Sequence, residues 1–373
     1  MRCPGLSASL VRLAALLGEV LGGPLVPAAQ IDETLIALAL RRHFVGPLFY
    51  AAVSNGRHVV APESLQRLEQ CYRANAAKQV LALTRLHRVA DEFRVRGINW
   101  MAFKGVMQAA QLYTDPVWRE SADIDILVTP GEFRRALEAL MDMGYIASNP
   151  PMRIPHVLRL PLLSMVRDVG FVARDDHSCA VELHQRLFFA NDRCTQSVGL
   201  RALQGPIPTP EVDHELALYL IMHGAACFWV RLKWLLDLVP LFAKLDNDEL
   251  VALMVGARRA GVEKSLAASL LLLQSLFPFV VFGPLSSWLL QMKAEPAVQQ
   301  RLFRYMEMLN QDSDWKSSPL DNAFQRQRAY WLLFEAPSAR LQLLRVPLLA
   351  VVRRIAWSFN KADRALTLSD TPP

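Results

Sequence analysis

Two aspartates, Asp123 and Asp125, lie two residues apart in the apolar segment Ala122–Val128. On a β-strand, residues two apart point to the same side, so both carboxylates would face one way while Ile124 and Ile126 face the other. Two like charges buried side by side repel each other, and a divalent cation between them removes that cost. Carboxylate oxygens at this spacing suit Mg²⁺, with Mn²⁺ as the alternative ion. The pair therefore predicts a metal site.

A third carboxylate, Glu182, lies in Val181–His184, which predicts another strand of the same sheet. If the two strands are neighbours, Glu182 joins the two aspartates. Three carboxylates that hold two Mg²⁺ ions are the arrangement used for in-line phosphoryl and nucleotidyl transfer. The sequence thus predicts Asp123, Asp125 and Glu182 as catalytic residues and metal ligands. His184 shares the strand face of Glu182, and it either serves the site as an accessory residue or only orients a carboxylate.

Lys104 and Gly105 predict an anion-binding element before the aspartates. Glycine lets the backbone approach a phosphate, the helix predicted to follow directs free N–H groups at the same place, and Lys104 adds a compact positive charge. Arg119, in the loop before the metal strand, would clamp a phosphate with two hydrogen bonds. Each residue alone also has a structural explanation, namely a solvated lysine or an ion pair from Arg119 to Glu120 or Asp115. The combination is more specific and predicts a nucleotide triphosphate site.

A later segment, predicted to be helical, carries the polar residues His214, His223, Arg231, Lys233 and Asp237. In a functional interpretation this helical wall closes over the nucleotide, with Arg231 or Lys233 reaching a phosphate and His223 lying near the acceptor. In a structural interpretation Lys233 and Asp237 form an (i, i+4) surface ion pair. Trp229 and Trp234 are most simply core anchors. The sequence leaves both interpretations open.

The elements that position these residues fall into three parts. Residues 1–96 are predicted to be helical, and the clearest helix begins at Pro62 and ends before Gly97, with proline at its start and glycine after its end. Residues 97–190 predict strands at 98–103, 122–128, 168–174 and 179–184 and helices at about 105–113 and 130–144. Residues 191–373 are predicted to be mostly helical, and no motif is recognised after about residue 260. The predicted fold class is therefore α+β, with a small mixed sheet embedded in mostly helical N- and C-terminal regions.

Composition restricts the class of protein. Hydrophobic residues make up 52% of the 373 residues and the net charge is only +6, which excludes intrinsic disorder. The mildly basic balance suits an anionic ligand such as a nucleotide, but long basic runs are absent, so no duplex nucleic acid is expected as a partner. The five cysteines are scattered and form no Cys-x-x-Cys pair, which disfavours a zinc site or a disulfide framework and predicts a cytoplasmic protein.

Three segments bear on membranes. The N-terminal stretch superficially resembles a signal peptide, but Arg12 and Glu19 interrupt its apolar run, and its leucine spacing favours an amphipathic helix. Segment Ser265–Phe282 is nearly free of charge but barely long enough to cross a bilayer, so a buried helix is the preferred interpretation. The basic stretch Arg340–Lys361 is either a contact with an anionic membrane surface or, in the preferred interpretation, a solvated helix face. No membrane span is expected.

Three blocks of the chain carry a resemblance to a known family. FKGVMQAAQLYTDPVWRESADIDILV (Phe103–Val128) resembles the uncharacterised nucleotidyltransferase family of the DNA polymerase β-like superfamily, whose pattern is Lys-Gly, Tyr-x-Asp-Pro, an Arg and then Asp-Ile/Leu-Asp-Leu-Leu-Val. VELHQRLF (Val181–Phe188) is similar to the acidic-x-His element of that family. HGAACFWVRLKWLLDLV (His223–Val239) is similar to its later His-Gly and Trp-x-Arg-Leu-Lys-Trp-x-x-Asp block. The resemblance spans about residues 30–245.

The resemblance implies a minimal polymerase β-like nucleotidyltransferase core with helical additions. It matches Asp123 and Asp125 with the metal aspartates of the superfamily and Glu182 with its third carboxylate. One departure is that the glycine-serine of the superfamily is Lys-Gly here, with 17 residues between Gly105 and Asp123, so phosphate binding is expected to differ in detail.

The predicted function is Mg²⁺-dependent transfer of an NMP from an NTP to an unidentified acceptor, with release of pyrophosphate. The acceptor would be a small molecule, a peptide or a protein. The alternative is a non-catalytic nucleotide-binding or scaffold protein that retains the nucleotidyltransferase fold. The presence of all three carboxylates favours the enzyme, because loss of one of them is the usual sign of a degenerate site.

Overall fold

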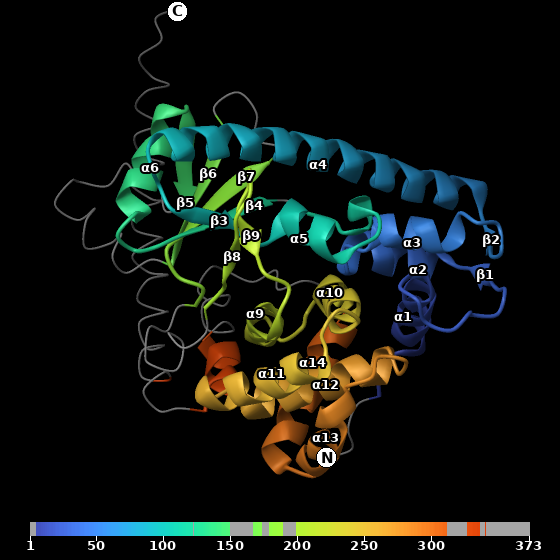
Figure 1. The fold of residues 1–373 in the computed structure, drawn as a ribbon. Helices are drawn as coiled ribbons and strands as arrows, with labels where there is room; N and C mark the ends of the chain where they lie inside the picture. Colours follow the sequence, from blue (N-terminus) through green and yellow to red (C-terminus); the bar gives the residue numbers. More distant parts are fainter. Residues whose placement is uncertain are drawn as a thin grey trace, which may run out of the picture.

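The computed structural model describes residues 5–121, 123–149, 167–173, 179–188, 199–311, 327–335 and 340. A five-stranded sheet in the order β3-β4-β7-β6-β5 lies beneath one end of the long helix α4 (Pro62–Val95) (Figure 1). The strands are β3 (Trp100–Ala102), β4 (Asp123–Val128), β5 (Tyr145–Asn149), β6 (Asp168–Ala173) and β7 (Ala180–His184). Strands β4 and β7 are parallel, whereas the other neighbouring pairs are antiparallel. The small mixed sheet predicted from the sequence is confirmed.

The edge strand β5 was not predicted from the sequence. It follows Gly144, where the preceding helix was expected to end. Its inner face carries Tyr145 and the small Ala147, whereas Ile146 on the other face is 44% exposed. A half-buried strand is recognised from large apolar residues that recur on its inner face, so one aromatic and one small residue give only a weak signal.

Helices form most of the remaining described chain. The N-terminal part comprises α1 (Ala8–Val20), α2 (Glu33–Ala37), a π-helical turn (Leu38–Arg42), α3 (Gly46–Val53) and α4 (Pro62–Val95), together with the paired β1 (Gln30–Ile31) and β2 (Val59–Val60). The core adds α5 (Gly105–Leu112), a 3₁₀ turn (Pro116–Trp118), α6 (Phe133–Asp142), and the paired β8 (Ala202–Leu203) and β9 (Thr209–Pro210). The C-terminal part comprises α9 (His214–Ala226), α10 (Leu232–Phe242), α11 (Asn247–Arg259), α12 (Glu263–Leu276), a 3₁₀ turn (Gly283–Leu285), α13 (Ser286–Met292) and α14 (Pro296–Asn310).

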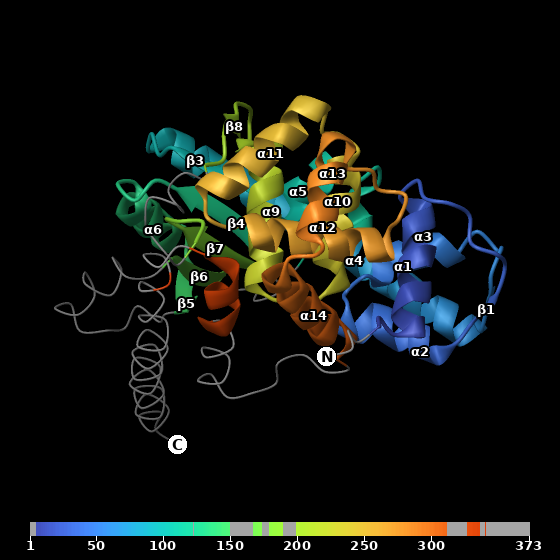
Figure 2. The ribbon, with the colours of Figure 1, turned by 90° about the horizontal axis from the view of Figure 1, so that it is seen from below.

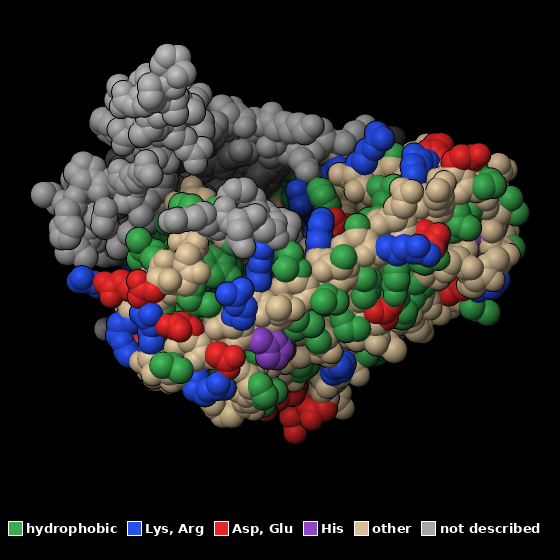
Figure 3. All heavy atoms as spheres, turned by 90° about the horizontal axis from the view of Figure 1, so that it is seen from above, with side chains coloured by type: hydrophobic (Ala, Val, Ile, Leu, Met, Phe, Trp, Pro, Cys, Tyr) green, Lys and Arg blue, Asp and Glu red, His purple; other side chains and the backbone are tan. Residues whose placement is uncertain are grey.

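The long helix α4 has the bounds that its proline and glycine predicted. Its inner face buries Leu86, Val89 and Phe93 against the sheet. Its outer face is solvent-exposed, and on the face of the molecule seen in Figure 3 acidic and basic side chains are interspersed among apolar ones. Within the described residues, this face therefore presents no continuous basic surface.

The two faces of the sheet have different environments. On one face Ile124, Ile126 and Val181 pack with α4 and α6 in one apolar cluster (Figure 1). On the other face the ring of Phe103 contacts Tyr219 of α9, with ring centroids 5.5 Å apart. The predicted alternation of the metal strand is thus satisfied, because its isoleucines take the first face and its aspartates take the second.

The N-terminal and C-terminal helices share an apolar core. Leu10 and Leu13 of α1 belong to the same cluster of buried residues as Leu270 and Leu273 of α12. Figure 2 shows α1–α3 lying beside the C-terminal helices. This shared core packs the N-terminal helices against the helices that face the second side of the sheet.

The nearly charge-free segment Ser265–Phe282 falls mainly in α12. This helix has 14 residues, and most of its side chains are buried. No helix in the described part of the chain is long and apolar enough to cross a membrane. The basic stretch Arg340–Lys361 lies outside the described residues except for Arg340 itself.

Candidate active site

The pairing of two parallel strands brings the predicted carboxylates together. In the register of β4 and β7, Asp125 lies opposite Glu182, and Asp123 lies opposite Ala180. The strand adjacency that the sequence could only assume is therefore present. Because side chains of paired residues lie on the same face, Asp125 and Glu182 point toward the helical wall together with Asp123.

Asp125 is the centre of the site. Its side chain is buried, and its Oδ1 lies 2.7 Å from Lys104 Nζ and 3.1 Å from His184 Nε2. The same Nε2 atom is 3.4 Å from Glu182 Oε2, so the histidine bridges the two carboxylates. Burial alone would raise the pKa of Asp125, but the charge of Lys104 and the hydrogen bond from His184 outweigh it and hold that pKa well below its usual range. The rings of Phe103 and His184 pack edge to face, with centroids 5.0 Å apart.

Three side chains in the described part of the chain can together hold a metal ion. The ligand atoms of Asp125, Glu182 and His184 all lie within 4.8 Å of one another. The sequence predicted Asp123 in this set and His184 only as an accessory residue. Asp123 lies on the same strand face, but it is not part of this closest cluster.

The electrostatics of Asp123 explain why a cation suits the site. The negative charge of Asp125, then burial, then the charge of Glu182 raise the pKa of Asp123 to about 6. The repulsion among the carboxylates therefore makes Asp123 easier to protonate than an isolated aspartate. Oxygen ligands of this kind fit a hard divalent cation, which would remove the repulsion.

Lys104 and Gly105 take up positions that the sequence only partly anticipated. Lys104 is placed beside the aspartate, where its ammonium is mostly buried against Asp125. Gly105 begins α5 with φ +64°, and a Cβ atom there would lie 2.7 Å from the carbonyl oxygen of Asp123. The glycine thus serves a close approach of α5 to the backbone of the metal strand, a contact that the phosphate interpretation did not include.

Replacing Gly105 with alanine should destabilise the protein by more than the backbone conformation alone requires. A left-handed alanine costs about 1–2 kcal/mol, and the contact with the Asp123 carbonyl should add to that cost. Gly97 is the matched control, because it has φ +60° and a Cβ there would meet nothing within 4 Å. Urea unfolding should show a larger loss of stability for Gly105→Ala than for Gly97→Ala. Equal losses would mean that α5 can shift away from the strand.

Arg119 is bound to a carboxylate in the protein interior. It pairs with Asp237 of α10 through two hydrogen bonds, from Nε at 2.8 Å and from Nη2 at 3.0 Å. Nη1 donates to Ser121 Oγ at 2.9 Å, and the Tyr113 hydroxyl donates to Asp237 at 2.9 Å. The edge of Arg119 that was predicted to clamp a phosphate therefore faces Asp237, and its ion-pair partner is neither Glu120 nor Asp115.

The helical wall places Lys233 at the Asp123 end of the site. Lys233 Nζ donates to the backbone oxygen of Glu120 at 3.4 Å. Asp237 pairs with Arg119 instead, so Lys233 and Asp237 do not form the (i, i+4) surface ion pair of the structural interpretation. Burial lowers the pKa of Lys233 to about 8, and its charge lowers the pKa of Asp123 in turn. The guanidinium of Arg231, at the start of α10, lies 4.1 Å from the centre of the Phe44 ring.

His223, Trp229 and Trp234 contact other side chains of the helices. The His223 ring lies between Tyr219 and Trp234, with ring centroids 6.1 and 5.5 Å away. Burial and the charge of Lys104 hold the pKa of His223 well below its usual range, so its imidazole is neutral. Trp229 is fully buried and donates from Nε1 to Ser269 Oγ at 3.0 Å, which confirms it as a core anchor. His214 lies at the start of α9 and bonds Glu249.

Comparisons with known proteins agree with this arrangement. Residues 29–278 match the model of the family described as "Uncharacterised nucleotidyltransferase". That span includes the sheet, the carboxylates on β4 and β7, and the helical wall through α12. No curated protein and no solved structure matches the chain. Since the match covers more than half of the 373 residues, the chain belongs to the uncharacterised nucleotidyltransferase family.

Proposed function

We propose that this protein is a Mg²⁺-dependent nucleotidyltransferase that moves an NMP from an NTP to an acceptor and releases pyrophosphate. The observation that carries the proposal is the cluster of Asp125, Glu182 and His184 on two adjacent parallel strands, with Asp123 on the same face. This cluster lies within a chain of a nucleotidyltransferase family. The fold and the carboxylates together favour transfer chemistry over a purely structural role.

Asp123, Asp125 and Glu182 would hold the metal, with His184 as a further ligand or as the group that orients the carboxylates. A bound divalent cation would lower the pKa of the acceptor hydroxyl and neutralise phosphate charge; Mn²⁺ is the alternative ion. Glu182 has the more exposed side chain of the paired carboxylates, at 34% against 3% for Asp125. It is therefore the better placed to receive the proton of the acceptor hydroxyl.

The triphosphate would lie toward the amino-terminal end of β4. Lys233 lies there, close enough for its charge to act on Asp123, and Arg231 begins the same helix. The first turn of α5, which begins at Gly105, adds backbone N–H groups. Lys104 would keep Asp125 ionised until the metal and nucleotide arrive, and the charge of Asp125 outweighs burial to hold the pKa of Lys104 above its usual range. Arg119 would contribute indirectly, by holding the loop before β4 in place against α10.

Nucleotide affinity should fall as the pH rises above about 8, because Lys233 loses its charge in that range. With a pKa of about 8, Lys233 is about one-tenth protonated at pH 9 in the nucleotide-free protein. We expect the affinity for MgNTP to fall severalfold between pH 7.5 and pH 9.5. Lys233→Arg keeps its charge throughout and should show a nearly flat profile. Identical profiles for both proteins would remove Lys233 from the nucleotide site.

The proposal is tested by NTP binding and pyrophosphate release. The purified protein is titrated with each NTP, with and without Mg²⁺, beside Asp123→Ala and Asp125→Ala. Metal-dependent binding that both substitutions abolish would support the site, and slow pyrophosphate release would show transfer to water in place of the acceptor. Binding without any release would favour the alternative, a non-catalytic nucleotide-binding protein. The absence of metal-dependent binding to every NTP would overturn the proposal.

We propose a cytoplasmic location on the basis of the cysteines. Cys71, Cys179 and Cys227 carry thiols rather than disulfides in the described part of the chain. Thiols persist in a reducing compartment. The scattered spacing of the cysteines in the sequence favours the same compartment.

A further inference from the structure

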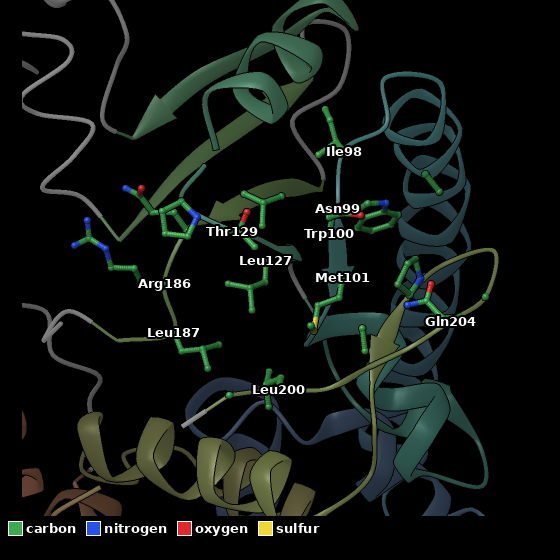
Figure 4. Close-up of a pocket in the computed structure, with 18 of the residues that line it drawn as sticks. Ile98, Asn99, Trp100, Met101, Leu127, Thr129, Arg186, Leu187, Leu200 and Gln204 are labelled. Carbon is green, nitrogen blue, oxygen red and sulfur yellow. The ribbon is translucent and has the colours of Figure 1, made fainter. Parts of the chain in front are cut away.

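A cavity of about 890 Å³ lies between the sheet and the segment around Leu200 (Figure 4). It lies at the carboxyl ends of β4 and β7, where Leu127 and Gln185 contribute to its lining. Leu127 follows Asp125 by two residues on β4, so it shares the sheet face of the carboxylates, and its partner in the strand register is His184. Two residues of a strand span roughly 7 Å, so the cavity begins about one side-chain position beyond Asp125.

The cavity lies at the opposite end of the site from the groups suited to a triphosphate. Gly105 contacts the backbone of Asp123, and the charge of Lys233 acts on Asp123, so both mark the amino-terminal end of β4. The cavity lining instead begins at Leu127, near the carboxyl-terminal end of β4. Along β4, the carboxylates therefore lie between Gly105 and Lys233 at one end and the cavity at the other. In a transfer reaction the leaving pyrophosphate and the acceptor stand on opposite sides of the α-phosphorus.

The lining of the cavity indicates a class of ligand. Met101, Leu127, Leu187 and Leu200 point into it and make its walls apolar (Figure 4). Two arginines, Arg94 and Arg186, also belong to the lining, but they come from different elements, and Arg94 forms an exposed ion pair with Asp91. A volume of this size holds a small organic molecule. Apolar walls suit a molecule that has an apolar body.

We propose that this cavity is the acceptor site, and that the acceptor is a small molecule with an apolar body and a hydroxyl group. The inference rests on the proposed function. The body lies against Leu127 and Leu200, and the hydroxyl reaches toward Asp125 and Glu182. In the transfer, the hydroxyl oxygen forms a bond to the α-phosphorus of the NTP. The bond from that phosphorus to the bridging oxygen breaks, pyrophosphate leaves with the electron pair, and the hydroxyl proton passes to Glu182.

The first test uses 8-anilinonaphthalene-1-sulfonate, a fluorescent dye with an apolar aromatic body and one negative charge. The intact protein is titrated with the dye beside Leu200→Glu and Leu200→Gln, two substitutions of similar size in a connecting segment outside the sheet. We expect saturable binding that Leu200→Glu weakens about tenfold or more, because like charges meet in the cavity. Leu200→Gln should stay within about threefold of wild type. Equal dye affinity in all three proteins would overturn the inference.

The second test separates the acceptor site from the nucleotide site. The dye titration is repeated with Mg²⁺ and each NTP at saturation. An acceptor site should retain the dye with an affinity within about threefold of the nucleotide-free value, because the two ligands occupy separate places. Displacement of the dye by an NTP would assign the cavity to the nucleotide and overturn the inference. If no NTP binds, the proposed function fails and the acceptor role falls with it, whereas the Leu200 series still decides whether the cavity binds this class of ligand.

Discussion

Replacing Asp125 with asparagine should lower the rate of nucleotide transfer by about a thousandfold, which corresponds to roughly 4 kcal/mol of transition-state stabilisation. Asparagine keeps the size of the side chain but removes the charge that Lys104 and His184 share. Its neutral amide cannot balance a divalent cation, so metal affinity should fall as well. Pyrophosphate release under saturating NTP and Mg²⁺ measures the effect. Asp142→Asn, which removes one partner of an exposed ion pair with Arg96, is the matched control and should leave the rate unchanged.

The same substitution should also destabilise the fold, because it leaves the Lys104 ammonium mostly buried without its counter-charge. Adding Lys104→Met should restore much of that stability but none of the activity. Recovery of activity in the double variant would show that Asp125 serves only to neutralise the lysine. A single variant that retains activity within about tenfold of wild type would remove Asp125 from the catalytic machinery altogether.

Replacing Asp237 with asparagine should reduce the free energy of unfolding by about 3–5 kcal/mol, the usual loss when one partner of a buried ion pair is removed. Arg119 is 8% exposed and donates to both oxygens of Asp237, while Tyr113 and Ser121 complete the network. The substitution leaves the guanidinium buried with one acceptor fewer and no counter-charge. Urea unfolding measures the loss.

The control is Glu138→Gln in the exposed pair with Arg134, which should cost about 0.5 kcal/mol or less. The double variant Arg119→Met/Asp237→Leu should recover most of the stability, since apolar residues of similar volume replace buried pairs without large cost. Because the pair ties α10 to the loop before β4, Asp237→Asn should also weaken metal binding at Asp123. A stability loss no larger than that of Glu138→Gln would show that solvent screens the Arg119–Asp237 pair.

Local patterns in the sequence predicted the elements that carry the site. The alternation of Asp123 and Asp125 with isoleucines specifies a strand with one charged and one apolar face, and that strand is β4. The proline at position 62 and the glycine at position 97 mark the ends of α4, because each residue acts on its own backbone. The strands predicted at 168–174 and 179–184 are present as β6 and β7, which pair antiparallel, and the segment between them lies outside the described residues. Signals of this kind arise within a few residues, so a single sequence contains them.

The partners of the charged side chains were decided only by the tertiary structure. Arg119 and Asp237 are separated by 118 positions, and nothing in their local spacing selects one for the other over nearer acids. Lys104 likewise meets Asp125 only because β3 and β4 pair, and His184 enters the metal cluster only because β7 lies parallel to β4. Strand order and helix docking are set by how the apolar faces of the whole chain are buried together. Periodicity along one sequence shows which face is apolar, but which face of another element covers it is decided by the packed core.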